Sequence, residues 1–414
     1  MVKRAKIWTA LGVAVLAGTG AANAGMLQSS HPIADANLVL VAGEGGGEGS
    51  GAENATIYAL QSTEPKAFQY DATAQIAAYV DLVSRSYQAA VADAALLEKA
   101  VDGLLAAPSA ENLAAARKAW IAARPAYLRT EAFRFYNGPI DRIESEINSW
   151  PINEAYLDYV EGKPDAGLIN DPKVKADIDF LEGLNQKQDE ADVTIGWHAV
   201  EFLLWGQDLS ATGAGNRPFT DYVAGQGSND RRRAYLKLVT GQLVKELAEL
   251  QADWDVSNPK SYGAEFKSFP QREAVGRIIN GMAILAGYEF MSERLGVALD
   301  SGDQEDEQSC FSDTTKQDFV HDLEGIKAVW TDAKLSALVA AQDPSLAKRV
   351  DGLFADTASK IAALGDPWDQ VLAAPKDSPA RKDAEAVVTA LQALADGLKA
   401  VGNTLGVLVL IPTD

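Results

Sequence analysis

Apolar residues recur at three- and four-residue spacing through most of the chain beyond about residue 70, and the alternation typical of strands is scarce. Such spacing places apolar side chains on one face of an α-helix. The pattern therefore predicts an all-α fold, and Pro125 should bend one of its helices. The expected helices span 72–95, 110–135, 171–186, 190–206, 230–253, 271–299, 315–341, 344–363 and 379–408.

A stretch rich in glycine and turn residues, 209–229, separates two loosely similar sets of these helices. Each set contains a long helix with carboxylates near its end, Glu131 in the first and Glu289 and Glu293 in the second. We therefore expect two related helical bundles, which together make a duplicated fold, and a binding site close to the interface between them. The N-terminal bundle would span 66–210 and the C-terminal bundle 230–414.

The first 24 residues have the pattern of a secretory signal peptide: basic residues, a short apolar run and small residues before Gly25. The apolar run is too short to span a bilayer, and no later segment is long and apolar enough for a transmembrane helix. Residues 25–65 are rich in Gly and Glu and are expected to form a disordered linker. The predicted location is the periplasm or the outer cell envelope.

The chain carries 58 acidic and 37 basic residues, a net charge of −21. A charge of this sign disfavours nucleic acid and anionic lipid as partners and favours cations, although it can also serve only for solubility. Cys310 is the single cysteine, so no intramolecular disulfide can form. We expect Cys310 to be a small buried side chain rather than a reactive thiol.

The most informative stretch contains His198 and Glu201, three residues apart in an otherwise apolar helical run. Positions three apart lie on the same face of a helix, so the imidazole and the carboxylate should be neighbours. Two interpretations remain open: a metal ligand pair, or a core histidine whose hydrogen bonds Glu201 satisfies. Gly196 and Gly206 flank the run and suggest a close approach of another element.

Glu131 is a second candidate ligand, because it lies among aromatic residues between Arg129 and Arg134. An ion pair with Arg134 along the helix explains it equally well. Asp141, ten residues later, is either part of the same constellation or a turn residue.

Glu289 and Glu293 form the third group, and the acidic loop 300–322 follows them. The loop lacks the glycine and distal glutamate of an EF-hand, but its carboxylates could still hold a hard cation. An exposed acidic loop is more often only solvated. Cys310 and Phe311 within it indicate that part of the loop packs onto the protein.

The sequence contains no His-Glu-x-x-His, Gly-x-Ser-x-Gly, phosphate-binding glycine loop or Cys-x-x-Cys motif. One well-placed histidine among many carboxylates favours iron or another oxygen-preferring divalent cation over zinc. Haem is also possible as a ligand, with His198 as its axial group.

Gly196-Trp197-His198-Ala199-Val200-Glu201 resembles the Gly-x-His-x-x-Glu motif of the imelysin family of bacterial envelope proteins. The similarity extends to Phe-Leu-Leu-Trp-Gly-Gln-Asp after the motif and to Thr-Glu-Ala-Phe-Arg-Phe-Tyr-Asn-Gly-Pro-Ile-Asp ending at Asp141. Asp-Gln-Glu-Asp-Glu-Gln-Ser-Cys-Phe-Ser-Asp, which ends at Asp313, resembles the family's iron-regulated protein A branch. The resemblance covers about residues 70–412.

This resemblance implies an exported protein of two helical bundles with a role in iron uptake or in the response to iron. The first hypothesis is a protein that binds iron, a ferric complex or haem at His198, Glu201, Glu131, Glu289 and Glu293, with a possible envelope iron-transport partner. The second is an imelysin-type metallopeptidase that uses His198 and Glu201, although a second nearby histidine is lacking. The third is a non-catalytic helical interaction module.

Overall fold

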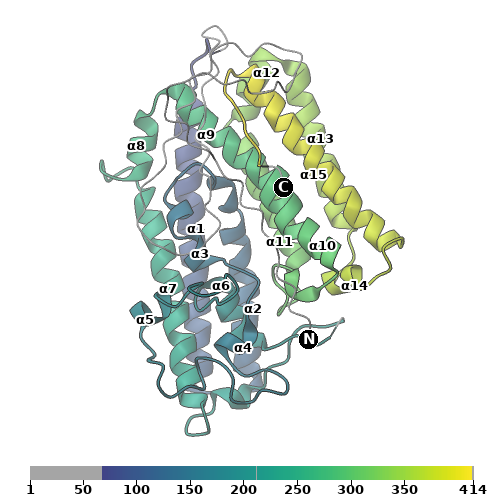
Figure 1. The fold of residues 1–414 in the computed structure, drawn as a ribbon. Coiled ribbons are helices and arrows are strands. Elements are labelled where there is room, and N and C mark those ends of the chain that lie inside the picture. The colour runs from purple at the N-terminus through teal and green to yellow at the C-terminus, as the bar shows by residue number, and fades with distance from the viewer. Residues whose placement is uncertain (1–67, 211, 413–414) are drawn as a thin grey trace, which may run out of the picture. The chain divides into compact units, whose positions relative to one another are not determined.

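The computed structural model describes residues 68–210 and 212–412 (Figure 1). The described residues form helices and loops, and their only strand-like pairing is an isolated antiparallel bridge between Val160 and Lys163. The prediction of an all-α fold is confirmed. The predicted signal peptide, 1–24, and the predicted linker, 25–65, lie outside the described residues.

Helices α1, α2, α6 and α7 form a first group (Figure 1). Helix α1 lies against α2 and α7, and α6 contacts both α2 and α7. Helix α7 begins at the predicted start of the C-terminal bundle, yet it packs on the helices that precede it. The bounds are α1 Thr73–Ala106, α2 Ala110–Leu128, α6 Gly196–Trp205 and α7 Asn229–Asp253.

A second group of helices packs around α15 (Figure 1). Helix α15 contacts α9, the π-helix η4 and α13, while α11 contacts α13 and α12. The bounds are α9 Gln271–Ile284, η4 Leu285–Gly296, α10 Val297–Ser301, α11 Thr315–Thr331, α12 Leu335–Gln342, α13 Pro344–Ala363 and α15 Pro379–Thr404.

Short helical segments fill the loops of both groups. The α-helical ones are α3 Glu144–Ile147, α4 Glu154–Leu157, α5 Ile178–Glu182, α8 Tyr262–Ser268 and α14 Trp368–Leu372. The 3₁₀ segments are η1 Glu131–Phe133, η2 Ile140–Arg142, η3 Phe219–Tyr222 and η5 Gln304–Asp306.

Several predicted helices differ from those observed. The helix expected at 171–186 is only the short α5, the helix expected at 190–206 begins at Gly196, and the helix expected at 72–95 continues to Ala106. Three more differ, and local backbone chemistry explains two of these. The helix expected at 110–135 ends at Leu128, where the backbone and hydroxyl of Thr130 both donate to the carbonyl of Tyr127 and tighten the last turn. The helix expected at 315–341 is interrupted at Lys334, which has a left-handed backbone (φ 59°). The helix expected at 271–299 changes to π geometry over Leu285–Gly296.

The two groups share one hydrophobic cluster of buried residues, which runs from Ala72 to Val409. Helix α11 contacts α2, and α9 contacts α1, so both groups contribute to this core. The division into related bundles at 66–210 and 230–414 stays a prediction.

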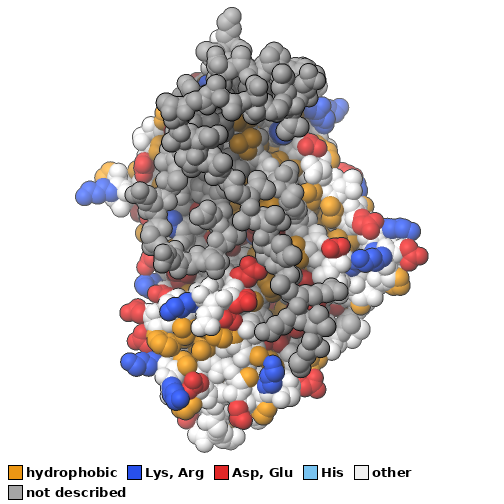
Figure 2. All heavy atoms as spheres, in the orientation of Figure 1, with side chains coloured by type: hydrophobic (Ala, Val, Ile, Leu, Met, Phe, Trp, Pro, Cys, Tyr) orange, Lys and Arg blue, Asp and Glu red, His pale blue; other side chains and the backbone are white. Residues whose placement is uncertain are grey.

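The surface of the described residues carries charged side chains of both signs and some exposed hydrophobic side chains. On the face shown in Figure 2, acidic and basic side chains lie interspersed. Among the described helices, none combines the length and the apolar character that crossing a bilayer requires.

Candidate functional site

His198 and Glu201 lie on α6, a helix whose residues are all buried. The helix can enter the core because Gly196 has φ +89° and leaves no space for a side chain against the backbone of α3. The His198 side chain is 1% exposed, and its Nδ1 lies 2.7 Å from Oε2 of Glu201. The expected contact between these two residues is confirmed.

The second ring nitrogen of His198 faces Arg124. Arg124 Nη2 lies 3.4 Å from His198 Nε2 and 3.5 Å from Oδ2 of Asp318, while Arg124 Nη1 donates to Asn148. Because a guanidinium group only donates, Nε2 must accept and Nδ1–H must donate to Glu201. The guanidinium also stacks on aromatic rings, with its Cζ 5.5 Å from the ring centre of Trp197.

Glu201 ties the acidic loop to this helix. Its Oε1 accepts from the backbone nitrogen of Ser312 at 2.9 Å and from the Ser312 hydroxyl at 2.6 Å. Burial raises the pKa of Glu201 to about 8. The hydrogen bonds from Ser312 favour the ionised form and partly oppose this rise. Burial also lowers the pKa of His198 well below its ordinary value, and Arg124 lowers it further, so the imidazole is neutral.

Glu131 and Glu289 lie in a neighbouring buried ion cluster. Glu131 Oε2 is 2.6 Å from Nη1 of Arg134 and 2.5 Å from Nη2 of Arg294. Glu289 accepts from the same Nη2 of Arg294 at 3.1 Å. Arg294 also pairs with Asp322 at 2.7 Å. The pairing of Glu131 with Arg134, one of the two interpretations of Glu131, is therefore present.

Burial acts differently on the carboxyl groups of this cluster. It disfavours the ionised form of Glu131, but Arg134 and Arg294 outweigh it and lower the pKa of that residue to about 2. For Asp322, burial dominates over Arg294 and raises the pKa to about 7. Burial likewise raises the pKa of Glu144, which lies 3.1 Å from Arg134, to about 7.

Trp150 connects the two clusters. Its ring centre lies 6.3 Å from that of His198, and the guanidinium carbon of Arg294 lies 5.4 Å from the same indole. The structure thus brings His198 together with Glu201, and Glu131 together with Glu289, in adjacent clusters. Glu293 lies on η4 with Glu289, is partly buried and has a partner of its own.

Within the described residues, two sets of three acidic side chains have oxygens within 4.8 Å of one another. Neither set includes His198, Glu201, Glu131, Glu289 or Glu293, but Asp313 of the second set belongs to the acidic loop 300–322, whose carboxylates the sequence suggested as cation ligands. The first set is Glu146, Glu182 and Glu246, and the second is Asp208, Asp313 and Asp369.

Sequence reasoning missed several residues that surround His198. A usable signal existed for Asp318 and Asp322, because they are four residues apart on the helical stripe that continues with Ile326 and Val329. Arg124 and Arg294 carried no comparable signal, since their partners are distant in sequence. The residues missed are Arg124, Asn148, Trp150, Arg294, Ser312, Asp318 and Asp322.

Asp141 and Cys310 are the two remaining residues for which the sequence suggested a role. The side chain of Asp141 accepts from the backbone nitrogens of Phe135, Tyr136 and Gly138, so Asp141 is a turn residue. Cys310 is partly buried, and burial with nearby carboxylates raises the pKa of its thiol well above the ordinary value, which favours the protonated, less nucleophilic form.

The imelysin family model matches residues 83–398. Iron-regulated protein A from Synechococcus elongatus is 25% identical over 342 residues, which cover 78% of this chain and 84% of that protein. The crystal structure of a candidate iron-regulated protein A precursor from Parabacteroides distasonis is similar with a TM-score of 0.66 and 20% identity, over 81% of this chain and 95% of that one. The crystal structure of an imelysin-like protein from Psychrobacter arcticum is similar with a TM-score of 0.57 and 17% identity, over 83% of this chain and 99% of that one. The family match spans most of the chain, and the protein belongs to the imelysin family.

Proposed function

We propose that this protein binds iron within the buried polar layer around His198 and Glu201, and that it takes part in iron uptake or in the response to iron. The names of the Synechococcus relative and of the Parabacteroides structure support an iron-related role. The proposal includes export, through the predicted signal peptide at 1–24, and an envelope partner that delivers or receives the iron.

The observation that carries the proposal is an excess of carboxyl groups over guanidinium groups in this layer. Six carboxyl groups that are buried or nearly buried face only three guanidinium groups. Ionising all of these carboxyl groups would leave unbalanced buried charge, which is costly, and a bound cation would reduce that cost. The carboxyl groups are those of Glu131, Glu144, Glu201, Glu289, Asp318 and Asp322, and the guanidinium groups are those of Arg124, Arg134 and Arg294.

The available atoms suit an iron ion. Glu201 holds the His198 ring through Nδ1, as carboxylates behind metal-bound histidines do, and leaves Nε2 with only the 3.4 Å contact to Arg124. Asp322 Oδ1 is buried without a hydrogen-bond partner. An ion entering between Nε2 and Asp318 would displace the Arg124 guanidinium, which lies between them. Nitrogen and oxygen donors of this kind are common ligands of iron.

The ligand set in this proposal comprises His198 and Asp318, with Glu201, Glu131, Glu289 and Glu293 as the surrounding carboxylates. An ion fits better than haem, because the imidazole is 1% exposed and packs against Trp150. Axial ligation of haem would require the helices around it to separate.

The test is anaerobic calorimetric titration of the full chain with Fe²⁺. Replacing His198 by Ala should weaken binding by about tenfold or more, because it removes the one imidazole of the site. His321→Ala is the matched control, since His321 pairs with Glu324 on α11 and should have no effect on affinity. Asp318→Asn is a second site variant and should also weaken binding, with circular dichroism used to confirm that each variant is folded.

Failure of the wild-type chain to bind iron, or equal binding by the folded His198→Ala and Asp318→Asn variants, would contradict the proposal. Protein cleavage that stops with chelator, returns with metal and is lost in Glu201→Gln would favour the metallopeptidase hypothesis instead.

A further inference from the structure

A second group of carboxyl groups lies apart from His198, where three segments meet. Asp208 follows α6, Asp313 belongs to the acidic loop, and Asp369 lies on α14. One oxygen from each lies within 4.8 Å of the others. Glu307 also belongs to the acidic loop. Burial raises the pKa of Glu307, and the nearby carboxylate of Asp369 raises it further. We call these four residues the aspartate cluster.

Asp208, Glu307 and Asp369 are buried and Asp313 is partly buried. In the described part of the chain only two hydrogen-bond donors reach the cluster: Ser210 N donates to Asp208 and the Thr315 hydroxyl donates to Glu307. Asp369 is 2% exposed, and neither of its carboxylate oxygens has a hydrogen-bond partner. Asp208 and Glu307 are 8% and 1% exposed, and each has one buried oxygen without a partner. Among the described residues, no ion pair connects any member of the cluster to Lys, Arg or His.

Carboxylates held together in this way repel one another, and each has lost its hydration. Burial raises the pKa of Asp208 to about 6 and that of Asp313 to about 7, and neighbouring carboxylates contribute in both cases. Either protons or a bound cation must therefore neutralise the cluster at neutral pH. A bound cation can take the place of the missing donors for the oxygens that lie together.

The donor set indicates the class of cation. All the ligand atoms are carboxylate oxygens, which suits hard cations such as Ca²⁺ rather than metals that prefer nitrogen or sulfur. Asp208 also lines a cavity of about 450 Å³ together with Gln207 and Ser210, which provides space for a hydrated ion to approach.

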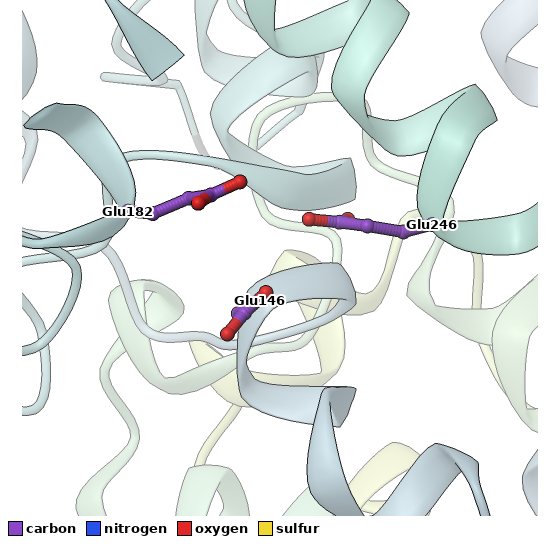
Figure 3. A group of neighbouring side chains, drawn as sticks. All are labelled: Glu146, Glu182 and Glu246. Carbon is purple, nitrogen blue, oxygen red and sulfur yellow. The ribbon is translucent and has the colours of Figure 1, made fainter. Parts of the chain in front are cut away.

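The other acidic trio is a weaker candidate. Glu146, Glu182 and Glu246 point toward one another from α3, α5 and α7 (Figure 3). However, the amide of Gln242 donates to both Glu182 and Glu246, and Glu146 and Glu182 are only partly buried. The Gln242 amide and solvent therefore already stabilise this trio. A variant of Glu246 is used as the control for the aspartate cluster.

We propose that Asp208, Asp313 and Asp369, together with Glu307, bind a divalent cation of the calcium class. This site is separate from the iron site proposed above. Its position gives it a structural role, because Asp313 directly follows Ser312, which donates two hydrogen bonds to Glu201. A bound cation would fasten the acidic loop to α14 and to the end of α6, and would thereby hold the segment that contacts Glu201.

The test compares thermal unfolding of the chelator-treated full chain at pH 8 with and without Ca²⁺. The wild-type Tm should rise with the logarithm of the Ca²⁺ concentration. Asp369→Asn should remove this rise and weaken Ca²⁺ binding in calorimetry by at least about tenfold. Without Ca²⁺, the variant should melt higher than wild type, because one of the repelling charges is gone.

Asp313→Asn is a second variant that should fold, because Asp313 has φ 56° and asparagine tolerates this conformation well. It should also lose the response to Ca²⁺. Glu246→Gln, the control from the other trio, should keep it. Both aspartate variants should bind Fe²⁺ like the wild type, which separates this proposal from the iron site.

A wild-type Tm that does not depend on Ca²⁺ would overturn the proposal. So would a Ca²⁺ response that survives in Asp369→Asn and Asp313→Asn, or one that only Glu246→Gln removes.

Discussion

Glu246 lies on the buried face of α7, 3% exposed, with Gln242 as its hydrogen-bond donor. Burial raises its pKa from 4.5 to about 8, and the nearby carboxylates of Glu146 and Glu182 add to the effect. A raised pKa means that the folded protein favours the protonated form. The contribution of Glu246 to stability is therefore complete below pH 4.5. It is lost progressively as the pH rises from 4.5 through about 8.

We predict that Glu246→Gln makes the protein more stable than wild type at pH 9, by about 1–3 kcal/mol, the cost of burying a poorly paired polar group. At pH 4, where Glu246 is protonated in both the folded and the unfolded state, the two should differ little. Urea denaturation at both pH values measures this. Glu249→Gln is the control, because Glu249 is exposed on the same helix. Equal stability of wild type and Glu246→Gln at pH 9 would contradict the prediction.

For single residues, spacing along the chain predicted contacts between near neighbours on a helix but not contacts between distant segments. The contact of His198 with Glu201, and that of Glu131 with Arg134, join residues three apart on the chain and were predictable. Arg294 reaches Glu131 across 163 residues. No local pattern indicates such a partner, so the sequence could not decide whether Glu131 meets a metal or a guanidinium group.

At the scale of elements, α6 depends on its first residue. A Cβ on Gly196 would lie 2.6 Å from the carbonyl oxygen of Ile147 and 2.7 Å from that of Glu146. Its φ of +89° is also unfavourable for any other residue. The expectation that this glycine allows a close approach is confirmed, with α3 as the neighbouring element.

We predict that Gly196→Ala destabilises the fold by about 1–3 kcal/mol from backbone strain alone, with the steric overlap adding to it. Chemical denaturation measures the change in the free energy of unfolding. Gly352→Ala on α13 is the matched control, because a Cβ there meets no atom within 4 Å and alanine favours a helix. A Gly196→Ala protein as stable as wild type would show that α6 can shift.

The spacing of apolar residues did not reveal that η4 is a π-helix. Apolar periodicity predicted one helix over 271–299, and the chain is indeed helical there. In a π-helix the hydrogen bonds join residues five apart, which brings Glu289 and Arg294 to neighbouring positions. This geometry lets Arg294 pair with Glu289, Glu131 and Asp322 together.

At the scale of the molecule, one hydrophobic cluster joins both groups of helices. Helix α7, on the C-terminal side of the predicted boundary, packs on α1, and α11 packs on α2. A shared core favours cooperative unfolding.

We therefore predict a single unfolding transition, with coincident curves from far-ultraviolet circular dichroism and from the fluorescence of the tryptophans among the described residues. Two separate transitions, one for each expected bundle, would instead indicate that the segments 66–210 and 230–414 are stable independently.

The sequence by itself determined that the chain is helical, because helix periodicity is a local property repeated in almost every segment. It also determined the His198–Glu201 pair and the close approach at Gly196, since both arise within or beside one helix. Only the tertiary structure decided that Arg294 pairs with both Glu131 and Glu289, and that Asp208, Asp313 and Asp369 meet. These contacts join segments distant along the chain, and their energies depend on burial, which no short stretch of sequence specifies.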